Sequence, residues 1–278
     1  MTATLIRRCL GVATIAIVAS LSLAACGGAT PSSSNNQLGT ITAGQLKFAF
    51  RSDDKPASFV QDGKPAGFLI DLTQAMAAKM GVTATYISTD FDSMLPDVRN
   101  HTYDSAAFDT LITPARQQVV DFTTAVEYSE AQLISRKSAP VTSVQAAGSK
   151  TVAVTTGSSL IPILQQQAKG VTVKEFPNIA SSANALEAGQ VDGLFTGVAT
   201  TSQLLAQHAD FTATQQINTG ESAFPVAPDK AALLKAMNSA LAAVIKDGTY
   251  TKLFAKWNPP NLLIPQGMLN AYPGMKQR

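Results

Sequence analysis

The side chains with the clearest chemistry in this chain are an arginine and a serine turn. Arg116 carries a planar guanidinium, which can hold both oxygens of a carboxylate at once. Gly157-Ser158-Ser159 lies between an expected strand and an expected helix, where N–H groups at a helix N-terminus favour negative charge. Neither signal is specific alone, because most arginines are exposed surface residues and Gly-Ser-Ser turns are common. Both favour the binding of an anionic group.

Groups suited to catalysis are scarce. The two histidines, His101 and His208, fall in a turn and at a helix end, and neither stands in a recognisable acid–base pair. Asp104 and Asp192 follow similar helix-to-strand turns, which indicates that each carboxylate ties down its turn. No Gly-x-Ser-x-Gly or His-x-x-x-His pattern occurs. We therefore expect no catalytic residue, no metal site and no cofactor.

Composition excludes two broad classes of protein. The 278 residues are 45% hydrophobic and 14% charged, with 21 Lys plus Arg against 19 Asp plus Glu. A disordered chain has fewer apolar residues, and a protein that binds nucleic acid by summed charge has basic runs, which this chain lacks. The length allows one large or two medium domains.

The N-terminus has the pattern of a secretory signal peptide. Arg7 and Arg8 precede an apolar run at residues 10–19 that is too short to cross a bilayer comfortably. Leu23-Ala-Ala-Cys26 followed by glycine resembles a bacterial lipobox, which implies cleavage after residue 25 and attachment of lipid to the Cys26 thiol. Acyl chains would then anchor the protein to the outer side of the membrane.

Processing at that site changes the charge and the cysteine count. Removal of residues 1–25 leaves 19 basic and 19 acidic groups, so no electrostatic steering is expected. Cys9 leaves with the signal and Cys26 would carry lipid, so no disulfide is expected. Residues 26–44 are rich in Gly, Ser, Thr and Asn and are expected to form a flexible tether.

Hydrophobic periodicity predicts alternating strands and helices in two sets. The first set has strands at 46–50, 82–87 and 103–107 and helices at 72–80 and 94–99, followed by an extended segment at 132–135. The second set begins after a break at 138–143 and has strands at 151–155, 171–176 and 191–195, with helices at 160–167 and 183–188. Two further helices are expected at 231–245 and 250–257. The pattern predicts an α/β fold with two similar lobes and largely parallel sheets.

The order of motifs along the chain resembles that of a known family. The series is Gly67-Phe68-x-x-Asp71-Leu72, Phe91 with Leu95-Pro96, Tyr103-Asp104, Ile112-Thr-Pro-Ala-Arg116, Val120-Asp121-Phe122, Gly157-Ser158-Ser159, Gly189-Gln-Val-Asp192 and the run from Asp247 to Trp257. In this order and spacing, the chain from Leu46 to Trp257 is similar to the bacterial extracellular solute-binding proteins of family 3, which serve polar amino acid ABC importers.

This resemblance implies a periplasmic-binding-protein type II fold, in which two α/β lobes joined by two hinge strands enclose the ligand. Lobe 1 would comprise residues 45–137 and 224–278, and lobe 2 residues 138–223. The implied function is capture of an amino-acid-like solute outside the cytoplasm and its delivery to ABC permease subunits by a monomeric lipoprotein. A periplasmic dehydratase or a ligand sensor on the same fold are the alternatives.

The resemblance assigns Arg116 to the ligand carboxylate but leaves the ammonium without its usual partner. The family's acidic residue five positions after the Asp192 equivalent is Gly197 here, and the corresponding position after Asp104 is Asp109. One hypothesis is that the acid has changed lobes and that Asp109 binds the ammonium. The other is that Asp109 binds local backbone and that the ligand has no ammonium. The sequence gives the two equal weight.

Other ligand-binding positions also depart from the family. Phe91 keeps an aromatic wall, but Arg51 stands in place of an early acidic residue and Asp54 in place of a stacking aromatic. Arg51 either pairs with a second acidic group on the ligand or pairs with Asp53 or Asp54 at the rim. Glu127 is expected to face solvent without a partner.

Overall fold

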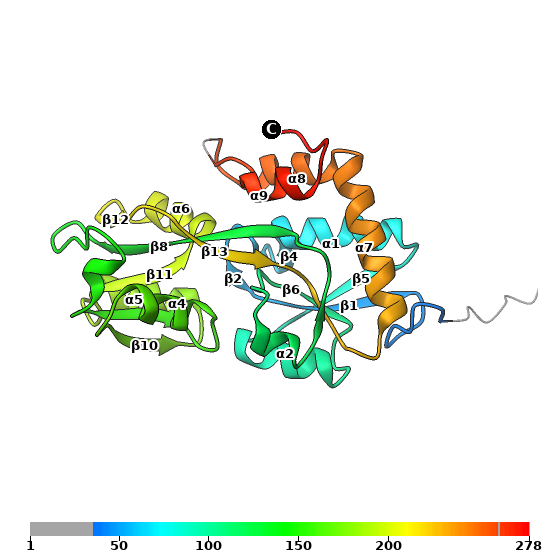
Figure 1. Ribbon diagram of the computed structural model, residues 1–278, viewed down its shortest axis with the longest axis horizontal. Helices are drawn as coiled ribbons and strands as arrows, with labels where there is room; N and C mark the ends of the chain where they lie inside the picture. Colours follow the sequence, from blue (N-terminus) through cyan, green and yellow to red (C-terminus); the bar gives the residue numbers. More distant parts are fainter. Residues whose placement is uncertain (1–35, 261, 278) are drawn as a thin grey trace, which may run out of the picture. The chain divides into compact units, whose positions relative to one another are not determined.

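The structure is a computed structural model that describes residues 36–260 and 262–277 (Figure 1). These residues belong to one compact unit. The predicted signal peptide, Cys26 and the first part of the predicted tether lie outside the described residues. Within the described ranges, no helix is both long and apolar enough to cross a membrane.

A three-stranded parallel sheet forms the centre of the first lobe. Strand β1 (Gln45–Phe50) lies between β5 (Thr83–Ser88) and β6 (Ser105–Ala107). Between β1 and β5 the chain forms the small antiparallel sheet of β2 (Asp53–Asp54), β3 (Ser58–Gln61) and β4 (Lys64–Ala66) and then helix α1 (Phe68–Lys79). Helix α2 (Phe91–Arg99) connects β5 to β6. Because the three strands are parallel, the loops that follow their C-terminal ends lie at the same edge of the sheet.

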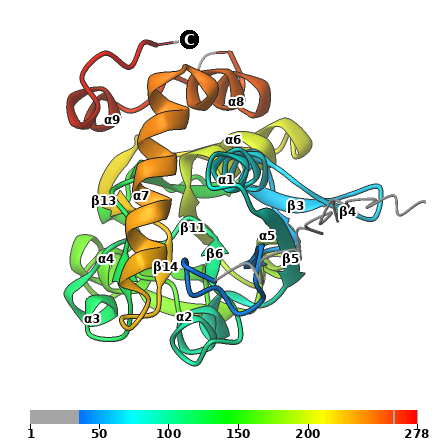
Figure 2. The ribbon, with the colours of Figure 1, turned by 90° about the vertical axis from the view of Figure 1, so that its right-hand side faces the viewer.

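The C-terminal part of the chain completes this lobe. Helices α7 (Ala231–Lys246) and α8 (Thr249–Trp257) pack against α1, and α9 (Gln266–Ala271) follows. Figure 2 shows α7 extending from the side of α8 towards β14 (Pro225–Val226), which pairs with β7 (Asp121–Phe122). The short helix α3 (Pro114–Gln117) precedes β7.

The second lobe has a mixed sheet with strand order β10-β9-β11-β8-β12. Strand β9 (Thr151–Thr155) is parallel to β10 (Thr172–Phe176) and β11 (Gly193–Gly197), and β8 runs antiparallel to β11 and to β12 (Phe211–Ala213). Helices α4 (Leu160–Gln167), α5 (Ile179–Glu187) and α6 (Val198–Gln207) each follow one of the parallel strands, and a 3-10 turn, η1 (Gln145–Ala147), precedes β9.

Two antiparallel strands run from one lobe to the other. Figure 1 shows β8 (Glu127–Arg136) and β13 (Ile217–Ser222) side by side between the two groups of elements. They pair from Glu127 opposite Ser222 to Ala131 opposite Ile217, and the later part of β8 joins the second sheet. The chain therefore passes between the lobes in a paired ribbon, as the type II fold requires.

Each lobe has its own buried core. One apolar cluster of the first lobe combines β1, α1, α7 and α8 and contains Phe48, Leu72, Leu241 and Tyr250, all fully buried. The Tyr250 hydroxyl donates to the carbonyl of Val126 at 2.8 Å, which satisfies its buried polar atom. Clusters of the second lobe contain Val152, Phe195, Leu186 and Leu194 in and against its sheet.

The predicted elements are found, with several differences in extent. Helix α1 begins at Phe68 and α5 at Ile179, each four residues before its predicted start. Strand 151–155 and helix 160–167 have the predicted bounds. Strand β8, however, begins at Glu127, well before the extended segment predicted at 132–135. Its first residues are largely polar, so apolar periodicity does not mark them, and pairing with β13 supplies their backbone hydrogen bonds instead.

Two aspartates hold equivalent turns in the two lobes. The Asp104 carboxylate accepts the N–H groups of Ile41 and Lys47, both at 2.8 Å, and Asp192 accepts that of Thr151 at 2.9 Å. In each lobe the carboxylate thus binds the central parallel strand, β1 or β9. The prediction that these residues tie down their turns is confirmed. Positions five residues further along are therefore structurally matched.

Candidate ligand-binding cleft

A cavity lies between the two lobes, and all eight predicted ligand-binding residues line it. It contains about 670 Å³ of empty space, part of it open to solvent. The predicted residues in its wall are Arg51, Asp54, Phe91, Asp109, Arg116, Ser158, Ser159 and Gly197. Leu111 also lines the cavity, and the lining residues that the sequence analysis did not select are Phe108, Ser129, Glu130, Thr155, Leu160, Ile179, Phe195, Thr196, Thr200 and Thr219.

Arg116 is a buried cation in the wall of this cleft. Its side chain follows the N-cap Thr113, whose hydroxyl accepts the Arg116 N–H at 3.2 Å and starts helix α3. The guanidinium donates to the Leu111 carbonyl at 2.9 Å and, across the cleft, to the Gly157 carbonyl at 3.2 Å. It also lies 5.2 Å from the centre of the Phe91 ring, a cation–π distance. Burial lowers the pKa of Arg116 to about 10, so it remains charged at neutral pH.

The serine turn faces Arg116 from the second lobe. Gly157 has φ +72° and approaches helix α2 so closely that a Cβ there would lie 3.1 Å from Asp92 Cα, so both its conformation and its surroundings favour glycine. The Ser158 hydroxyl accepts the N–H of Leu160 at 3.2 Å, at the start of α4. Ser159 is the N-cap of α4 and makes no side-chain capping bond. The helix start therefore presents polar groups to the same space as Arg116.

Asp109 occupies the first-lobe position that matches Gly197. Its carboxylate accepts the Ser129 hydroxyl at 3.1 Å, so it binds a crossing strand and not its local backbone. Burial raises the pKa of the Asp109 carboxyl, the Ser222 hydroxyl lowers it, and the nearby Asp54 charge raises it. Asp109 is therefore an acid held beside the hinge strands at the edge of the cleft.

Gly197 ends strand β11 opposite Asp109 and leaves room beside it. Its φ of −64° suits any L residue, and an added Cβ would lie 3.9 Å from its nearest neighbour, the Glu130 carbonyl oxygen. The glycine is therefore required neither by backbone conformation nor by crowding. Its effect is to leave the cleft without a side chain at this point.

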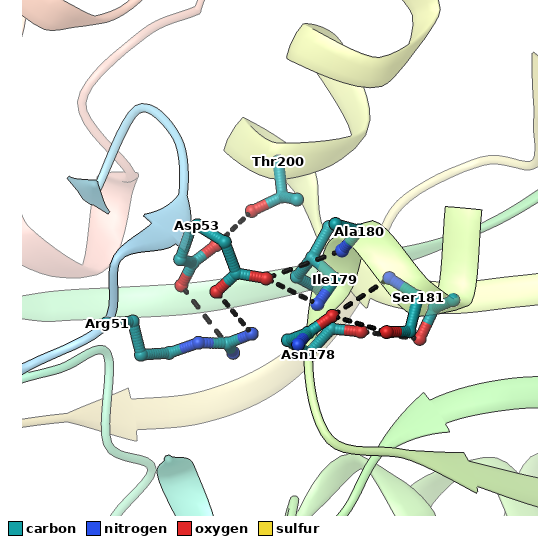
Figure 3. A network of polar contacts seen from close by, with 9 residues as sticks. Arg51, Asp53, Asn178, Ile179, Ala180, Ser181 and Thr200 are labelled. Carbon is teal, nitrogen blue, oxygen red and sulfur yellow. Dashed lines mark hydrogen bonds and ion pairs between the residues drawn. The ribbon is translucent and has the colours of Figure 1, made fainter. Parts of the chain in front are cut away.

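A polar network connects the first lobe to two helices of the second (Figure 3). Arg51 lies 3.4 Å from an Asp53 oxygen and 3.9 Å from an Asp54 oxygen. Asp53 accepts the N–H of Ile179 at 2.9 Å, at the start of α5, and Asp54 accepts the Thr200 hydroxyl at 2.8 Å, near the start of α6. The two neighbouring aspartates thus bind separate helices of the opposite lobe.

This network shows the internal pairing that is one of the two interpretations of Arg51. Arg51 also lines the cleft, so a contact with the ligand stays a prediction. Its side chain is only 9% exposed, against 24% for Asp53 and 14% for Asp54, so the three groups are withdrawn from solvent and not at an open rim. Burial raises the pKa of Asp54, while Arg51 and then Thr200 lower it. Arg51 acts as the counter-charge of two aspartates, and those aspartates hold the lobes together.

The expectation that Glu127 faces solvent is wrong. It is partly buried at the first position of β8 and lines a second cavity together with Asp54, Asp109 and Glu130. Burial raises the pKa of Glu127 well above its usual value, and the neighbouring Asp109, Asp54 and Glu130 charges raise it further. Glu130 and Ser129 were missed for the same reason as the start of β8, because no apolar pattern marks this part of the strand.

The described residues include no cluster of His, Cys, Asp and Glu side chains suited to hold a metal ion. His101 pairs with Asp229 at 3.3 Å and His208 stacks on Phe211, and neither lines the cleft. The polar groups in the cleft are carboxylates, hydroxyls and guanidinium groups. Their chemistry is the recognition of a small charged solute.

Two α/β lobes, two crossing strands and a polar cleft between them define a type II periplasmic binding protein. The sequence profile of the bacterial extracellular solute-binding proteins, family 3, matches residues 46–260. The chain therefore belongs to this family of extracytoplasmic solute-binding proteins.

Relatives of the chain have similar lengths and folds. It is 29% identical over 229 residues to ABC transporter arginine-binding protein 1 of Escherichia coli strain K12, which covers 80% of this chain and 93% of that one. An ancestral arginine-binding protein bound to arginine matches with a TM-score of 0.73 and 30% identity over 77% of this chain and 98% of that one. The ancestral amino acid-binding protein AncCDT-1, a precursor of cyclohexadienyl dehydratase, matches with a TM-score of 0.72 and 26% identity over 78% and 96%.

Proposed function

We propose that this protein captures a small amino-acid-like solute in the cleft and delivers it to the permease subunits of an ABC importer. The observation that carries the proposal is Arg116, a buried guanidinium that faces the Ser158-Ser159 turn and has no carboxylate within 4.0 Å among the described residues. Asp109 acts on this charge only from beyond ion-pair distance, and a buried charge without a close ion pair is costly, so a ligand carboxylate placed there gains an electrostatic partner. The arginine-binding relatives support an amino acid as the solute class.

Asp109 is the proposed partner of the solute's ammonium. It lies in the same cavity as Arg116, and its bond goes to a hydroxyl, which leaves its remaining lone pairs for a cationic donor. Gly197 offers no alternative carboxylate on the opposite side. Phe91, Ser158, Ser159, Arg51 and Asp54 complete the proposed ligand-binding wall.

The proposed cellular arrangement follows from the N-terminal sequence and from the family. The signal peptide at 1–25 would be removed, Cys26 would carry the lipid, and 26–44 would tether the protein to the membrane. Residues 45–137 and 224–278 would form lobe 1 and residues 138–223 lobe 2. The solute would reach the cleft from the outer side of the membrane, and the protein would act as a monomer.

We favour solute binding without catalysis as the activity of the cleft. The likeness to a dehydratase precursor keeps an enzyme on this fold as an alternative, and it would have to rely on Asp109 or Glu127. The described lining of the two cavities places no histidine, lysine or cysteine beside either carboxyl, and the curated relatives are binding proteins, so binding is the simpler proposal. A ligand sensor would use the same cleft and differ only in its membrane partner.

A thermal-shift screen of the mature chain tests the proposed function. Amino acids, their amine-free analogues and dicarboxylates are compared on the wild type, on Asp109→Asn and on the exposed control Asp210→Asn. A solute that binds only the folded state at about 100 times its Kd stabilises it by about 2.7 kcal/mol. We expect an amino acid to raise the Tm of the wild type and of D210N, with a smaller rise in D109N.

The amine-free analogues decide the role of Asp109. If they raise the Tm as much as the amino acids do, or if D109N responds as the wild type does, Asp109 does not bind an ammonium. If no compound of either kind raises the Tm, the proposed amino-acid-like solute is wrong.

A further inference from the structure

The two strands that connect the lobes, β8 and β13, carry a pair of buried serines. Ser129 lies on β8 and Ser222 ends β13, and the two residues are 6% and 0% exposed. Their hydroxyl oxygens are 2.5 Å apart, so they form one hydrogen-bonded pair between the strands. The Ser129 hydroxyl also donates to Oδ1 of Asp109 at 3.1 Å. An acidic residue of the cleft is therefore bonded to the connection between the lobes.

The hydroxyl protons of this cluster set the direction of its hydrogen bonds. A serine hydroxyl has one proton, and that of Ser129 is donated to Asp109. The contact between the serines then uses the proton of Ser222, so donation runs from Ser222 to Ser129 to Asp109. A chain in this direction ends on an acceptor and favours the charged carboxylate. A carboxylate has about four lone-pair sites, so sites remain for an ammonium donor.

The backbone holds both serines in place. Strand β13 has a bulge just before Gly220, which pairs with Ser129 and has φ +124°, a conformation that favours glycine. In the bulge, the Thr219 hydroxyl donates to the Ser129 carbonyl at 2.9 Å. The Ser222 carbonyl accepts the N–H of Val126 at 2.8 Å. Two hydroxyls fixed in this way determine where the carboxylate that accepts from them lies.

The segment that carries Asp109 is paired to the same strands. Leu111 forms an antiparallel bridge with Ser222, and the N–H of Ile112 donates to a carbonyl of β13 at 2.8 Å. The Leu111 carbonyl in turn accepts from the Arg116 guanidinium at 2.9 Å. Both charged groups that we propose to bind the solute are thus attached to β13 or its partner strand, Asp109 through hydroxyls and Arg116 through a carbonyl.

The surroundings of Asp109 oppose its charge, and the serines support it. Burial raises the pKa of Asp109 most and the Asp54 charge raises it further, whereas the hydroxyls of Ser222 and Ser129 lower it. The ionisable groups that face Asp109 are Asp54, Glu127, Glu130, Arg116 and Tyr250. Without the hydroxyls the carboxyl would take up its proton at higher pH, and a protonated carboxyl does not attract an ammonium.

We propose that Ser129 and Ser222 are positioning residues, which hold the Asp109 carboxylate on the connecting strands and keep it charged for the ammonium of the solute. This inference rests on the proposed function and adds two residues to its site. Ser222 is not among the residues that line the cleft, so its effect on the solute passes through the pair.

NMR titration of the Asp109 carboxyl carbon in the mature chain without solute tests the pair. The variants are Ser129→Ala and Ser222→Ala, and D109N assigns the signal. Ser135→Ala is the matched control, because Ser135 is fully buried on the same strand and its hydroxyl accepts the Val141 N–H at 3.0 Å. We expect S129A and S222A each to raise the pKa of Asp109 by about 1, a tenfold change in proton affinity, and S135A to leave it unchanged. An unmoved pKa in both variants would overturn the proposal.

Calorimetric titration at a series of pH values tests the effect of the pair on binding. L-arginine is compared with 5-guanidinopentanoate and L-glutamine with glutaramate, because each analogue lacks only the α-ammonium. We expect S129A and S222A to weaken amino acid binding by about tenfold and to leave binding of the analogues unchanged. The pH below which amino acid binding is lost should rise by about one unit, because Asp109 is then protonated at higher pH. Equal weakening of amino acid and analogue, at an unmoved pH, would show a merely structural role.

The wild type separates failure of this inference from failure of the proposed function. If the analogues bind the wild type as tightly as the amino acids do, solute capture stands and the positioning role is wrong. If no compound binds here or in the thermal-shift screen, the proposed function is wrong and the ammonium role of the pair falls with it. The NMR titration still decides in that case whether the two serines hold the Asp109 charge.

Discussion

Three acidic residues line the cleft, Asp54, Asp109 and Glu130, and Asp109 is the one that we propose as the partner of the ammonium, on the lobe opposite to the one that the family pattern indicates. Asp104 and Asp192 bind the central strands of their lobes in the same way, so Asp109 and Gly197, five residues beyond them, are matched positions. Asp109 reaches the hydroxyl of Ser129 on a crossing strand. A ligand bound to Asp109 would lie beside β8, one of the two strands that connect the lobes. The charge of the ligand would then act directly on the connection between the lobes.

Arg116→Lys is predicted to weaken solute binding by about 30-fold or more. Lysine has a point charge on a flexible stem and cannot replace the planar fork, and the bonds to the Leu111 and Gly157 carbonyls that position the guanidinium would be lost with it. Calorimetric titration with the solute identified in the screen measures the change. The exposed Arg99→Lys serves as the control, and unchanged affinity in R116K would show that the carboxylate lies elsewhere.

Acidification is predicted to weaken the binding of cationic solutes. The pKa values of Asp109 and Glu127 are raised, so both carboxyls take up protons at higher pH than usual and lose the charge that attracts a cation. Asp54, Glu130 and Arg116 face the same groups and are part of the same equilibrium. Affinity for a basic amino acid should fall as the pH is lowered from 7 towards about 5, and affinity for its neutral analogue should change less.

The same groups should act in the opposite direction on the stability of the protein without solute. A carboxyl with a raised pKa binds its proton more tightly in the folded state, so its contribution to stability is lost as the pH rises from about 4 through its folded-state pKa. Urea unfolding at a series of pH values measures this slope. E127Q should flatten it, and an unchanged slope in E127Q would show that Glu127 does not titrate in this range.

At the scale of elements, the segment between β1 and β3 acts as a clasp between the lobes. Asp53 caps the N-terminus of α5 from the opposite lobe, at a sequence separation of 126 residues, and Asp54 binds Thr200 of α6. The carboxylate of Asp53 lies where a helix macrodipole favours negative charge, and α5 also has its own N-cap in Asn178. The clasp therefore holds the two lobes together and leaves the local N-cap of α5, Asn178, in place.

Asp53→Asn is predicted to weaken the binding of every solute by the same factor. The amide keeps the size of the side chain but loses the charge that favours the α5 N-terminus and Arg51, so the closed arrangement is less populated. An effect of about 1 kcal/mol corresponds to about fivefold in Kd. Titration with one cationic and one neutral amino acid measures it, with D210N as the control. A change that differs between the two solutes would contradict a role in closure alone.

Gly267→Ala is predicted to destabilise the protein by about 1–3 kcal/mol, because helix α9 packs closely on β8. A Cβ at Gly267 would lie 2.2 Å from an atom of the Tyr128 ring, far inside van der Waals contact. Urea unfolding measures the loss. In the background of Tyr128→Ala the same glycine substitution should cost little, and an equal cost in both backgrounds would rule out this clash as the cause.

At the scale of the whole molecule, the predicted lipid anchor would hold the protein and its cleft at the membrane surface. A chain with formally balanced charge has no electrostatic attraction to the membrane, so attachment would depend on the lipid at Cys26. Cys26→Ala is predicted to move the protein from the membrane fraction to the soluble fraction and to abolish labelling with a radioactive fatty acid. Cys9→Ala is the matched control, and retention of C26A in the membrane would contradict the lipobox.

The sequence by itself determined the alternation of strands and helices, the family and the turn-binding roles of Asp104 and Asp192. It also selected eight residues that the fold brings to one cavity. These features follow from local patterns, because periodicity of 2 or 3.6 residues, glycine turns and motif spacing are readable along the chain.

Only the tertiary structure decided which charges pair and which cavities they line. Arg51 binds two aspartates, each of those aspartates binds a helix of the other lobe, and Glu127 lies in an acidic wall instead of facing solvent. A charged residue has the same local sequence signal whether it is solvated or paired across a cleft. Its burial and its partners depend on segments distant in the sequence, so they are set when the lobes meet.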